Sequence, residues 1–323
     1  MIDLKDVIPV RVVRKTVESE GIVSFELVHA EAGRLPSFAP GAHIDVHIPG
    51  GFVRQYSLCN AARKTGRYVV AVLRDPSSRG GSTALHDSVS EGDTLEISPP
   101  RNHFKLNGES VHSLLLAGGI GVTPIFCMAE QLYEEGRSFE LHYCARNKQK
   151  MAFHDAMSQA AWSSSLRLHF DDGAPAQKFD IDSVLEGAGA DTHLYVCGPQ
   201  GYMDAVLDAA RGMGWAQERL HYEYFKADVI HKDTDSDFEV EIASTGTVLS
   251  VPADRSIASV LNEHGFNISM SCEQGVCGTC VTKVLSGVPD HRDSFLLPDE
   301  RDANDQMTPC CSRAKSKRIV LDL

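Results

Sequence analysis

Five cysteines lie near the C-terminal end of the sequence in an arrangement that suits metal ligation. Cys272, Cys277 and Cys280 follow the pattern C-x4-C-x2-C, and the adjacent Cys310 and Cys311 come 30 and 31 positions after Cys280. Cysteines with this spacing and a fourth thiolate further along the chain are typical of [2Fe–2S] sites, which carry electrons. The sequence therefore predicts a cluster held by the first three cysteines and by one of the adjacent pair.

Two glycines support this interpretation. Gly275 and Gly278 lie among the three closely spaced cysteines, and glycine allows a tight loop to bring thiolates together and to direct N–H groups at the sulfurs. The alternatives are a zinc site, which usually has two C-x2-C-like pairs, and buried cysteines that bind nothing. The spacing, the glycines and the distant fourth thiol favour the cluster.

Two segments in the first third of the chain could hold a phosphate monoester. One is RQYS, which begins at Arg54, and the other is RGGST at residues 79–83. A guanidinium together with glycine-exposed N–H groups and hydroxyls can surround a phosphate. Taken singly, each segment also fits an ordinary strand or turn.

A third glycine-rich segment suits a pyrophosphate. Residues 117–124 read AGGIGVTP and lie between the apolar run 113–116 and a helical stretch that begins near Ile125. A strand, then glycines, then a helix N-terminus presents N–H groups and the positive end of the helix dipole to an anion. The segment does not match the dinucleotide-binding pattern G-x-G-x-x-G. The spacing of its glycines is therefore only partial evidence for a dinucleotide site.

The elements that must position these residues fall into three regions. Residues 10–100 contain short β-rich segments separated by turn residues, which predicts an antiparallel β-barrel. From Ser113 buried strands alternate with helical stretches, which predicts a parallel α/β sheet. The last region predicts a small α+β domain with a helix near residues 256–265. The predicted boundaries are 1–107 for the barrel, 108–225 for the α/β domain, 226–237 for an exposed linker and 238–323 for the cluster domain.

Composition excludes several classes of protein. The net charge of −13 argues against nucleic acid as a partner. No apolar run is long enough to span a membrane, and the first residues lack a secretion signal, which predicts a cytoplasmic location. Nine cysteines, an odd number placed unevenly, do not suggest the disulfides of a secreted protein.

The cysteine segment SCEQGVCGTC resembles plant-type ferredoxins, whose β-grasp fold is then expected for residues 238–323. In those proteins the last ligand falls 30 positions after the third, and that position is Cys310 here. The resemblance thus implies that Cys272, Cys277, Cys280 and Cys310 hold the cluster and that Cys311 is a free thiol beside it.

The other segments resemble the ferredoxin–NADP reductase superfamily, in which RxYS binds flavin and GGxGxTP binds the nicotinamide dinucleotide. A flavin barrel, a nucleotide domain and a C-terminal ferredoxin, in this order, resemble the phthalate dioxygenase reductase family, whose members use FMN. The resemblance implies an FMN site made by Arg54, Tyr56, Ser57, Val72, Gly80, Gly81 and Ser82, with Phe225 stacked on the flavin ring.

The same resemblance implies where NADH binds. Thr123 and Cys197 are expected beside the nicotinamide as the residues of the catalytic site. The expected nucleotide-binding residues are Gly118, Gly119, Gly121, Thr123, Asp171, Cys197, Gly198 and Pro199. Asp171 and Asp172 stand where relatives that prefer NADPH place basic residues. A carboxylate accepts hydrogen bonds from a ribose 2′-OH and repels a 2′-phosphate, so NADH is the expected donor.

The resemblance finally implies a direction for the electrons, from NADH through FMN and the cluster to a Rieske-type oxygenase that acts on an aromatic or related small substrate. We expect a monomer whose linker 226–237 lets the cluster domain move between flavin and partner. Two alternatives are an FAD-containing reductase of a non-Rieske oxygenase and a redox-sensing module in which the nucleotide only regulates.

Overall fold

The computed structural model describes residues 7–63, 66–76, 78, 80–226 and 232–323. These residues form two compact units, and the division falls between Glu223 and Tyr224. Within the described ranges, no helix has the length and apolar character needed to cross a membrane.

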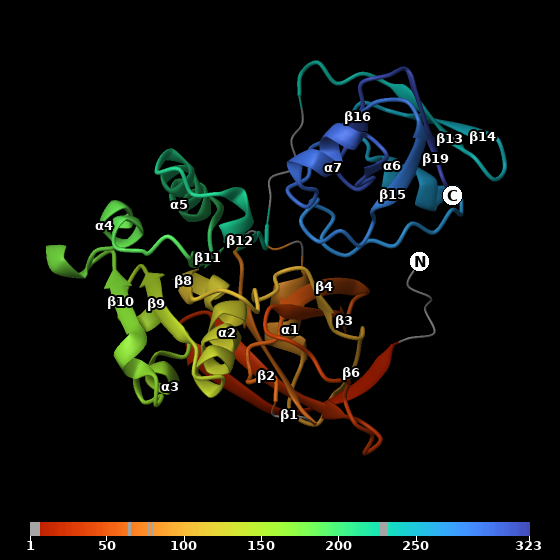
Figure 1. The fold of residues 1–323 in the computed structure, drawn as a ribbon. Helices are drawn as coiled ribbons and strands as arrows, with labels where there is room; N and C mark the ends of the chain where they lie inside the picture. Colours follow the sequence, from red (N-terminus) through yellow and green to blue (C-terminus); the bar gives the residue numbers. More distant parts are fainter. Residues whose placement is uncertain (1–6, 64–65, 77, 79, 227–231) are drawn as a thin grey trace. The chain divides into compact units, whose positions relative to one another are not determined.

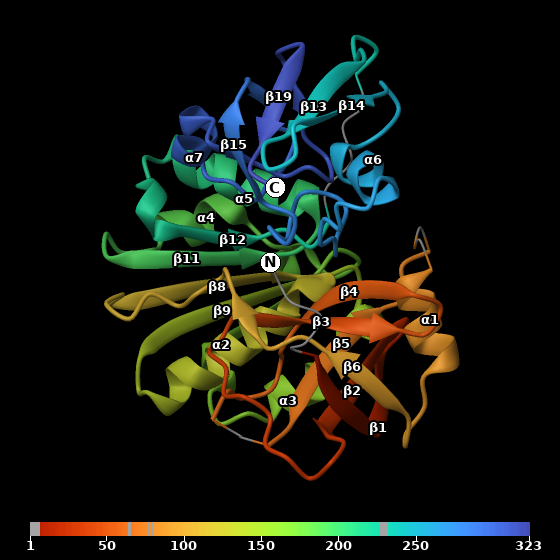
Figure 2. The same ribbon diagram turned by 90° about the vertical axis from the view of Figure 1, so that its right-hand side faces the viewer.

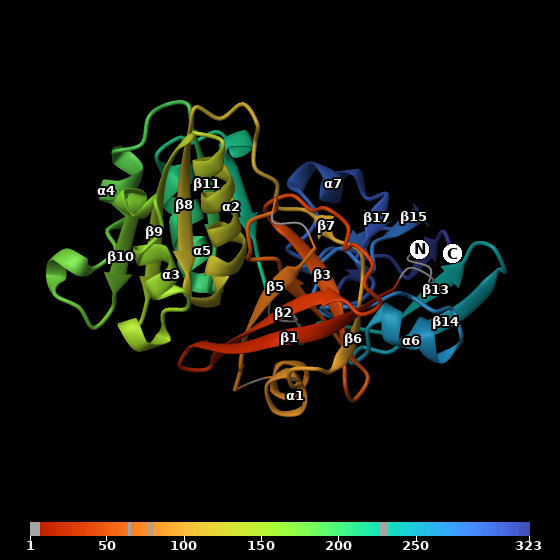
Figure 3. The same ribbon diagram turned by 90° about the horizontal axis from the view of Figure 1, so that it is seen from below.

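The first part of the N-terminal unit is an antiparallel sheet (Figures 1 and 3). Its strands are β1 (Ile8–Ser19), β2 (Ile22–His29), β3 (Ala42–Ile48), β4 (Phe52–Ser57), β5 (Tyr68–Leu73), β6 (Thr94–Ile97) and β7 (Arg101–Asn102). The strand order is β4-β3-β6-β1-β2-β5, and β7 pairs with β3. A bridge between Leu58 and Val70 joins the two edges and closes the barrel, as the sequence predicts.

Alternation along the strands explains the barrel core. In β1 the side chains of Val10 and Val12 are buried while Arg11 is exposed, because successive side chains of a strand point to opposite faces. The inward faces of the other strands add Phe25, Ile44 and further apolar residues to the same core. The helix α1 (Gly81–Ser88) packs against β3, β4 and β5.

The second part of this unit is a parallel sheet with helices on both faces (Figures 1 and 2). Its strands are β8 (His112–Gly118), β9 (Ser138–Ala145), β10 (Leu166–Phe170), β11 (Thr192–Cys197) and β12 (Leu220–Glu223). The main helices are α2 (Val122–Glu134), α3 (His154–Ser158), α4 (Ile181–Glu186) and α5 (Gln200–Gly212). The strand order is β10-β9-β8-β11-β12, so the order reverses at β8. Ligands of such sheets bind beyond the carboxyl ends of the strands at this point of reversal.

The C-terminal unit has a mixed sheet around a short helix. Its elements are β13 (Phe238–Ile242), β14 (Thr247–Val251), α6 (Ile257–Glu263), β15 (Thr282–Ser286), β16 (Pro289–Asp290), α7 (Pro298–Ala303), β17 (Gln306–Met307), β18 (Arg313–Ala314) and β19 (Arg318–Leu321). The strand order is β14-β13-β19-β15-β17, with β13 and β19 parallel. The helix predicted near residues 256–265 is confirmed as α6, whereas the sequence analysis did not identify β15 or α7.

The predicted linker 226–237 lies in the C-terminal unit, and its residues 227–231 lie outside the described residues. Its second half is exposed, but it is anchored. Asp235 forms an ion pair with Arg292, Lys232 pairs with Asp290, and Arg313 donates a hydrogen bond to the carbonyl of Ser236. Residues 232–237 are therefore held by the cluster domain, which the polar composition of the segment did not reveal.

Candidate functional site

The cysteine sulfurs of the C-terminal unit converge on one another. The thiol of Cys272 contacts those of Cys277 and Cys310, and Cys310 also contacts Cys280. A [2Fe–2S] cluster needs two thiolates for each of its two irons. The four contacting sulfurs of Cys272, Cys277, Cys280 and Cys310 fit that donor set. In the described residues no group of three or more His, Cys, Asp or Glu is arranged around a single metal ion.

The cluster loop needs glycine at two positions. Gly275 has φ +74° and Gly278 has φ +69°, a backbone conformation that residues with a side chain rarely adopt. A Cβ atom on Gly278 would lie 2.2 Å from the ring of Phe295. The N–H groups of Gln274 and Val276 donate to the sulfur of Cys272 at 3.4 Å. The loop therefore directs two backbone donors at the sulfur of Cys272, which fits a cluster whose sulfurs accept hydrogen bonds.

The adjacent cysteines have different neighbours. Cys310 contacts Cys272, Cys280 and Cys311. Cys311 is buried next to Thr308, with 3.3 Å between its sulfur and the threonine hydroxyl. The contacts thus place Cys310, and not Cys311, among the other three sulfurs.

The two predicted flavin segments meet in the barrel. A Cβ atom on Gly81 would lie 2.8 Å from Cγ of Arg54, so the glycine lets the arginine stem cross the start of α1. Gly80 precedes α1 with φ +101° and lies against the ring of Phe52. Among the residues that the structure describes, no side chain caps α1. Its first N–H groups and the Arg54 guanidinium together form a cradle that fits the phosphate of FMN.

The remaining predicted flavin residues are arranged around these strands. Burial raises the pKa of Tyr56, and Ser57 is buried at the end of β4. The hydroxyl of Ser82 accepts a hydrogen bond from the N–H of Asp75 at 3.3 Å. Val72 has its side chain in the barrel core, and its carbonyl lies 2.9 Å from Nε2 of His86. Contact of these four residues with FMN stays a prediction.

The two predicted nucleotide motifs meet at the point where the strand order reverses. A Cβ atom on Gly121 would lie 2.3 Å from the carbonyl oxygen of Cys197, and one on Gly118 would lie 2.9 Å from Cδ of Pro199. A Cβ atom on Gly198 would lie 3.0 Å from Cα of Gly118. Both following helices, α2 and α5, begin without a side-chain cap. The N–H groups and the dipole at such helix starts suit the pyrophosphate of NADH.

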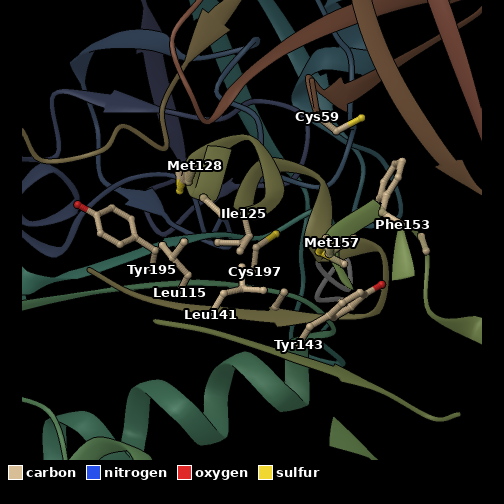
Figure 4. Close-up of a cluster of buried hydrophobic side chains, with 14 of the residues drawn as sticks. Cys59, Leu115, Ile125, Met128, Leu141, Tyr143, Phe153, Met157, Tyr195 and Cys197 are labelled. Atoms are coloured by element: carbon tan, nitrogen blue, oxygen red, sulfur yellow. The ribbon is translucent and has the colours of Figure 1, made fainter. Parts of the chain in front are cut away.

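The two residues predicted for the catalytic site are both buried. The hydroxyl of Thr123 donates to the carbonyl of Ile120 at 3.1 Å. Cys197 has no exposed surface and lies among apolar side chains such as Ile125 and Leu115 (Figure 4). Burial, and next the nearby Glu223 carboxylate, raise the pKa of Cys197 well above its usual value. Its thiol therefore stays protonated, which suits a hydride transfer that needs no nucleophile.

Asp171 directly follows β10. Its N–H donates to the carbonyl of Ala145 at 3.2 Å, and its carboxylate is exposed. The carboxylate lies close enough to Cys144 to help raise the pKa of that thiol to about 12, although burial is the main cause. Asp171 is thus placed at the carboxyl ends of β9 and β10, where an adenosine ribose binds in sheets of this kind.

The sequence analysis missed Glu223. This residue ends β12, in register with Cys197 of β11. Ser57 donates a hydrogen bond to Oε2 of Glu223 at 3.5 Å, and Nδ1 of His43 lies 3.6 Å from Oε1. A signal was present, because an acidic residue ends a parallel strand of the nucleotide sheet in the segment HYEYF. Phe225 lies in the C-terminal unit, so its stacking on the flavin stays a prediction.

These features define a class of protein: a flavin- and nucleotide-binding reductase with a C-terminal [2Fe–2S] domain. Residues 115–208 match the family described as oxidoreductase NAD-binding domain, and residues 240–315 match the 2Fe-2S iron-sulfur cluster binding domain. The vanillate O-demethylase oxidoreductase of Pseudomonas putida is 52% identical over 313 residues, which cover 97% of this chain and 98% of that protein.

Two further relatives agree over the whole length. The phthalate dioxygenase reductase of Burkholderia cepacia is 42% identical over 97% of this chain and 96% of that protein. A solved phthalate dioxygenase reductase, described as a modular structure for electron transfer from pyridine nucleotides to [2Fe-2S], superposes with a TM-score of 0.77 at 41% identity, covering 99% and 98% of the two chains. The chain belongs to the phthalate dioxygenase reductase family.

The protein is therefore an NADH-dependent flavin iron–sulfur oxidoreductase whose cofactors are FMN, a [2Fe–2S] cluster and NADH. Bound FMN would supply the conversion from a two-electron donor, the hydride of NADH, to the single electrons that the cluster takes up. The residues of this chain bind, orient and shield these groups. Family membership favours this reductase over the redox-sensing module.

Proposed function

We propose that the electrons leave this protein for the Rieske-type oxygenase of an O-demethylase or dioxygenase system that acts on an aromatic or related small substrate. The observation that carries the proposal is the match over nearly the full length to a vanillate O-demethylase oxidoreductase, at 52% identity against 42% for the phthalate dioxygenase reductase. An O-demethylase that acts on an aromatic methyl ether is therefore the favoured partner. A monomer and a cytoplasmic location stay predictions from the sequence.

We also propose roles for the residues. Cys272, Cys277, Cys280 and Cys310 hold the cluster, which the contacts among their sulfurs support. Arg54 and the start of α1 bind the FMN phosphate, with Gly80, Gly81 and Ser82 near it and Tyr56, Ser57, Val72 and Phe225 along the rest of the flavin. The glycines at 118, 119, 121 and 198, with Pro199, bind the pyrophosphate of NADH, while Thr123 and Cys197 lie beside the nicotinamide and Asp171 binds the adenosine ribose.

The backbone explains why these residues suit hydride transfer. Gly121 allows the loop between β8 and α2 to contact the backbone of Cys197 at the end of β11. The nicotinamide side of the site is therefore built from the ends of these two strands, which are in direct contact. Both strand ends belong to the same compact unit as Ser57 on the flavin side. The unit can thus hold donor and acceptor in a fixed relative orientation, which is the main contribution a protein makes to such a reaction.

The partner is tested by reconstitution. The full-length protein, with FMN and cluster, is mixed with the oxygenase component of the Pseudomonas putida vanillate O-demethylase, NADH and vanillate, and the released formaldehyde is measured. We expect formaldehyde only when both proteins and NADH are present. Rapid NADH-dependent reduction of cytochrome c without any formaldehyde would show an active reductase with a different partner.

The cluster ligand is tested by two matched variants. We expect Cys310→Ser to lose the visible absorbance and the reduced-state electron paramagnetic resonance signal of the cluster, since one of the four sulfur donors is replaced. Cys311→Ser changes the neighbouring thiol in the same way and should retain both signals. The opposite result would assign the fourth ligand to Cys311.

A further inference from the structure

His43 is a buried histidine that the chemistry described so far does not use. It lies in β3, and its side chain is 5% exposed. Nδ1 lies 3.6 Å from Oε1 of Glu223, whereas Nε2 is buried and has no hydrogen-bond partner within the part of the chain that the structure describes. A buried ring nitrogen without a partner is unfavourable. Packing in the barrel core does not by itself explain a histidine at this position.

Glu223 connects three strands through its two carboxylate oxygens. One oxygen faces His43 of β3, and the other accepts from Ser57 of β4. His43 and Ser57 are themselves cross-strand partners in the barrel. Glu223 is also the register partner of Cys197 in β11. A single carboxylate on β12, the strand next to the one that carries Cys197, thus contacts β3 and the flavin-binding strand β4 of the barrel.

We propose that His43 is a positioning residue for hydride transfer, which acts through Glu223 to hold the nucleotide-binding sheet in register with the flavin-binding strand. Hydride transfer requires the reacting atoms to be about 3–3.5 Å apart, and a misplacement of about 1 Å can slow such a step ~100-fold. In this proposal the contact made by His43 sets this distance, because it orients Glu223, whose carboxylate accepts from Ser57 and whose backbone pairs with Cys197.

The charges around His43 are consistent with this role. Arg101 of β7 is the cross-strand partner of His43, and its guanidinium is bound to Asp45 at 2.6 Å. The ring of His103 lies 5.6 Å from that of His43. Burial is the main cause that lowers the pKa of His103, and His43, Arg101 and Lys105 lower it further. Glu223 acts in the opposite sense and raises the pKa of His103, so its carboxylate lies near His103 as well as near His43 and Ser57.

The inference rests on the proposal that FMN and NADH occupy the residues named above. It is tested in the full-length protein by stopped-flow reduction of the flavin with NADH in the absence of oxygen. For His43→Asn we expect the limiting rate of flavin reduction to fall about 10- to 100-fold while the dissociation constant of NADH changes less than about twofold. His47→Asn is the matched control, because His47 lies on the same strand and face without contact to Glu223; it should keep the parent rate.

A double-variant cycle shows whether His43 acts through Glu223. If it does, the double variant His43→Asn with Glu223→Gln is no slower than Glu223→Gln alone. Independent effects that multiply, or an unchanged limiting rate in His43→Asn, would overturn the inference. Loss of FMN from His43→Asn, measured by the flavin-to-protein absorbance ratio, would assign it a role in flavin binding and also overturn it. Failure of the parent protein to reduce its flavin with NADH would contradict the proposed function instead.

Discussion

Gly275 leaves room for the sulfur of Cys311, since a Cβ atom at this position would lie 2.4 Å from that sulfur. The same atom would lie 2.9 Å from Cα of Asp293, so the side chain cannot be accommodated by turning the cysteine alone. We therefore expect Gly275→Ala to lose the [2Fe–2S] cluster or to bind it only in part. Iron content and the absorbance of the cluster, relative to protein, measure this.

A matched control separates the steric contact from backbone strain. Gly265 has φ +85°, close to that of Gly275, but a Cβ there would meet nothing within 4 Å. Gly265→Ala should cost roughly 1–2 kcal/mol of stability, as expected for a residue forced into this conformation, and should keep its cluster. Equal cluster contents in the two variants would contradict the steric explanation.

Gly81 allows a second close approach, in the flavin site. A Cβ on Gly81 would lie 2.8 Å from Cγ of Arg54, which would push the guanidinium away from the start of α1. We expect Gly81→Ala to weaken FMN binding by about 10-fold, since a charge-assisted phosphate contact contributes roughly 1.5–3 kcal/mol. Quenching of FMN fluorescence on titration into the flavin-free protein measures the affinity. Gly108→Ala, at a site with open space around it, should bind FMN as the parent does.

Much of the site could be predicted because its signals are local. The residues from Cys272 to Cys280 lie on one loop, and the glycines from 118 to 121 lie between one strand and its helix. The chemistry of such a segment is therefore visible in a short stretch of sequence. The order of barrel, parallel sheet and cluster domain followed from the change between strand-rich and alternating patterns.

The part that could not be predicted depends on contacts between distant residues. Ser57 and Glu223 are 166 positions apart, and nothing in either segment indicates that they meet. In the sequence, Asp235 is one of several carboxylates of a polar linker. Nothing nearby indicates its pairing with Arg292, 57 positions later. Such pairs are created by the topology of the fold, which a local pattern does not encode.

Asp171 gives a prediction about cofactor choice. Its carboxylate is exposed at the carboxyl ends of β9 and β10, where it can accept hydrogen bonds from a ribose and repel a 2′-phosphate. We expect Asp171→Ser to raise kcat/KM for NADPH by about 10-fold or more, because an unfavourable charge contact is removed. Steady-state reduction of cytochrome c with each nucleotide measures the ratio. Asp172→Ser is the control, and an equal gain there would show that the neighbouring residue sets the preference.

Arg292 gives a prediction about stability. Its side chain is 3% exposed and forms ion pairs with Asp235 and Asp290. Removing one partner of a buried ion pair costs roughly 3–5 kcal/mol, and we expect the lower part of this range because Asp290 keeps its pair with Lys232 and Asp235 lies 3.9 Å from Arg313. We expect Arg292→Ala to lower the temperature at which the circular dichroism of the full-length protein reports unfolding of the C-terminal unit. Arg318→Ala, which breaks a pair with Glu239 that is about half exposed, should cost no more than about 1 kcal/mol.

The acid dependence of this stability follows from Asp235. Hydrogen bonding to Arg292 is the main cause that holds the pKa of Asp235 below its usual value. A carboxyl whose pKa is lower in the folded state stabilises the protein above its unfolded pKa of about 3.9, and this stabilisation is lost as the pH falls below that value. The difference in unfolding temperature between the parent and Arg292→Ala should therefore be constant from about pH 7 to 5 and should narrow below about pH 4. A difference that stays constant through the acid range would mean that Asp235 keeps its charge without Arg292, and that the loss of stability has a cause other than this ion pair.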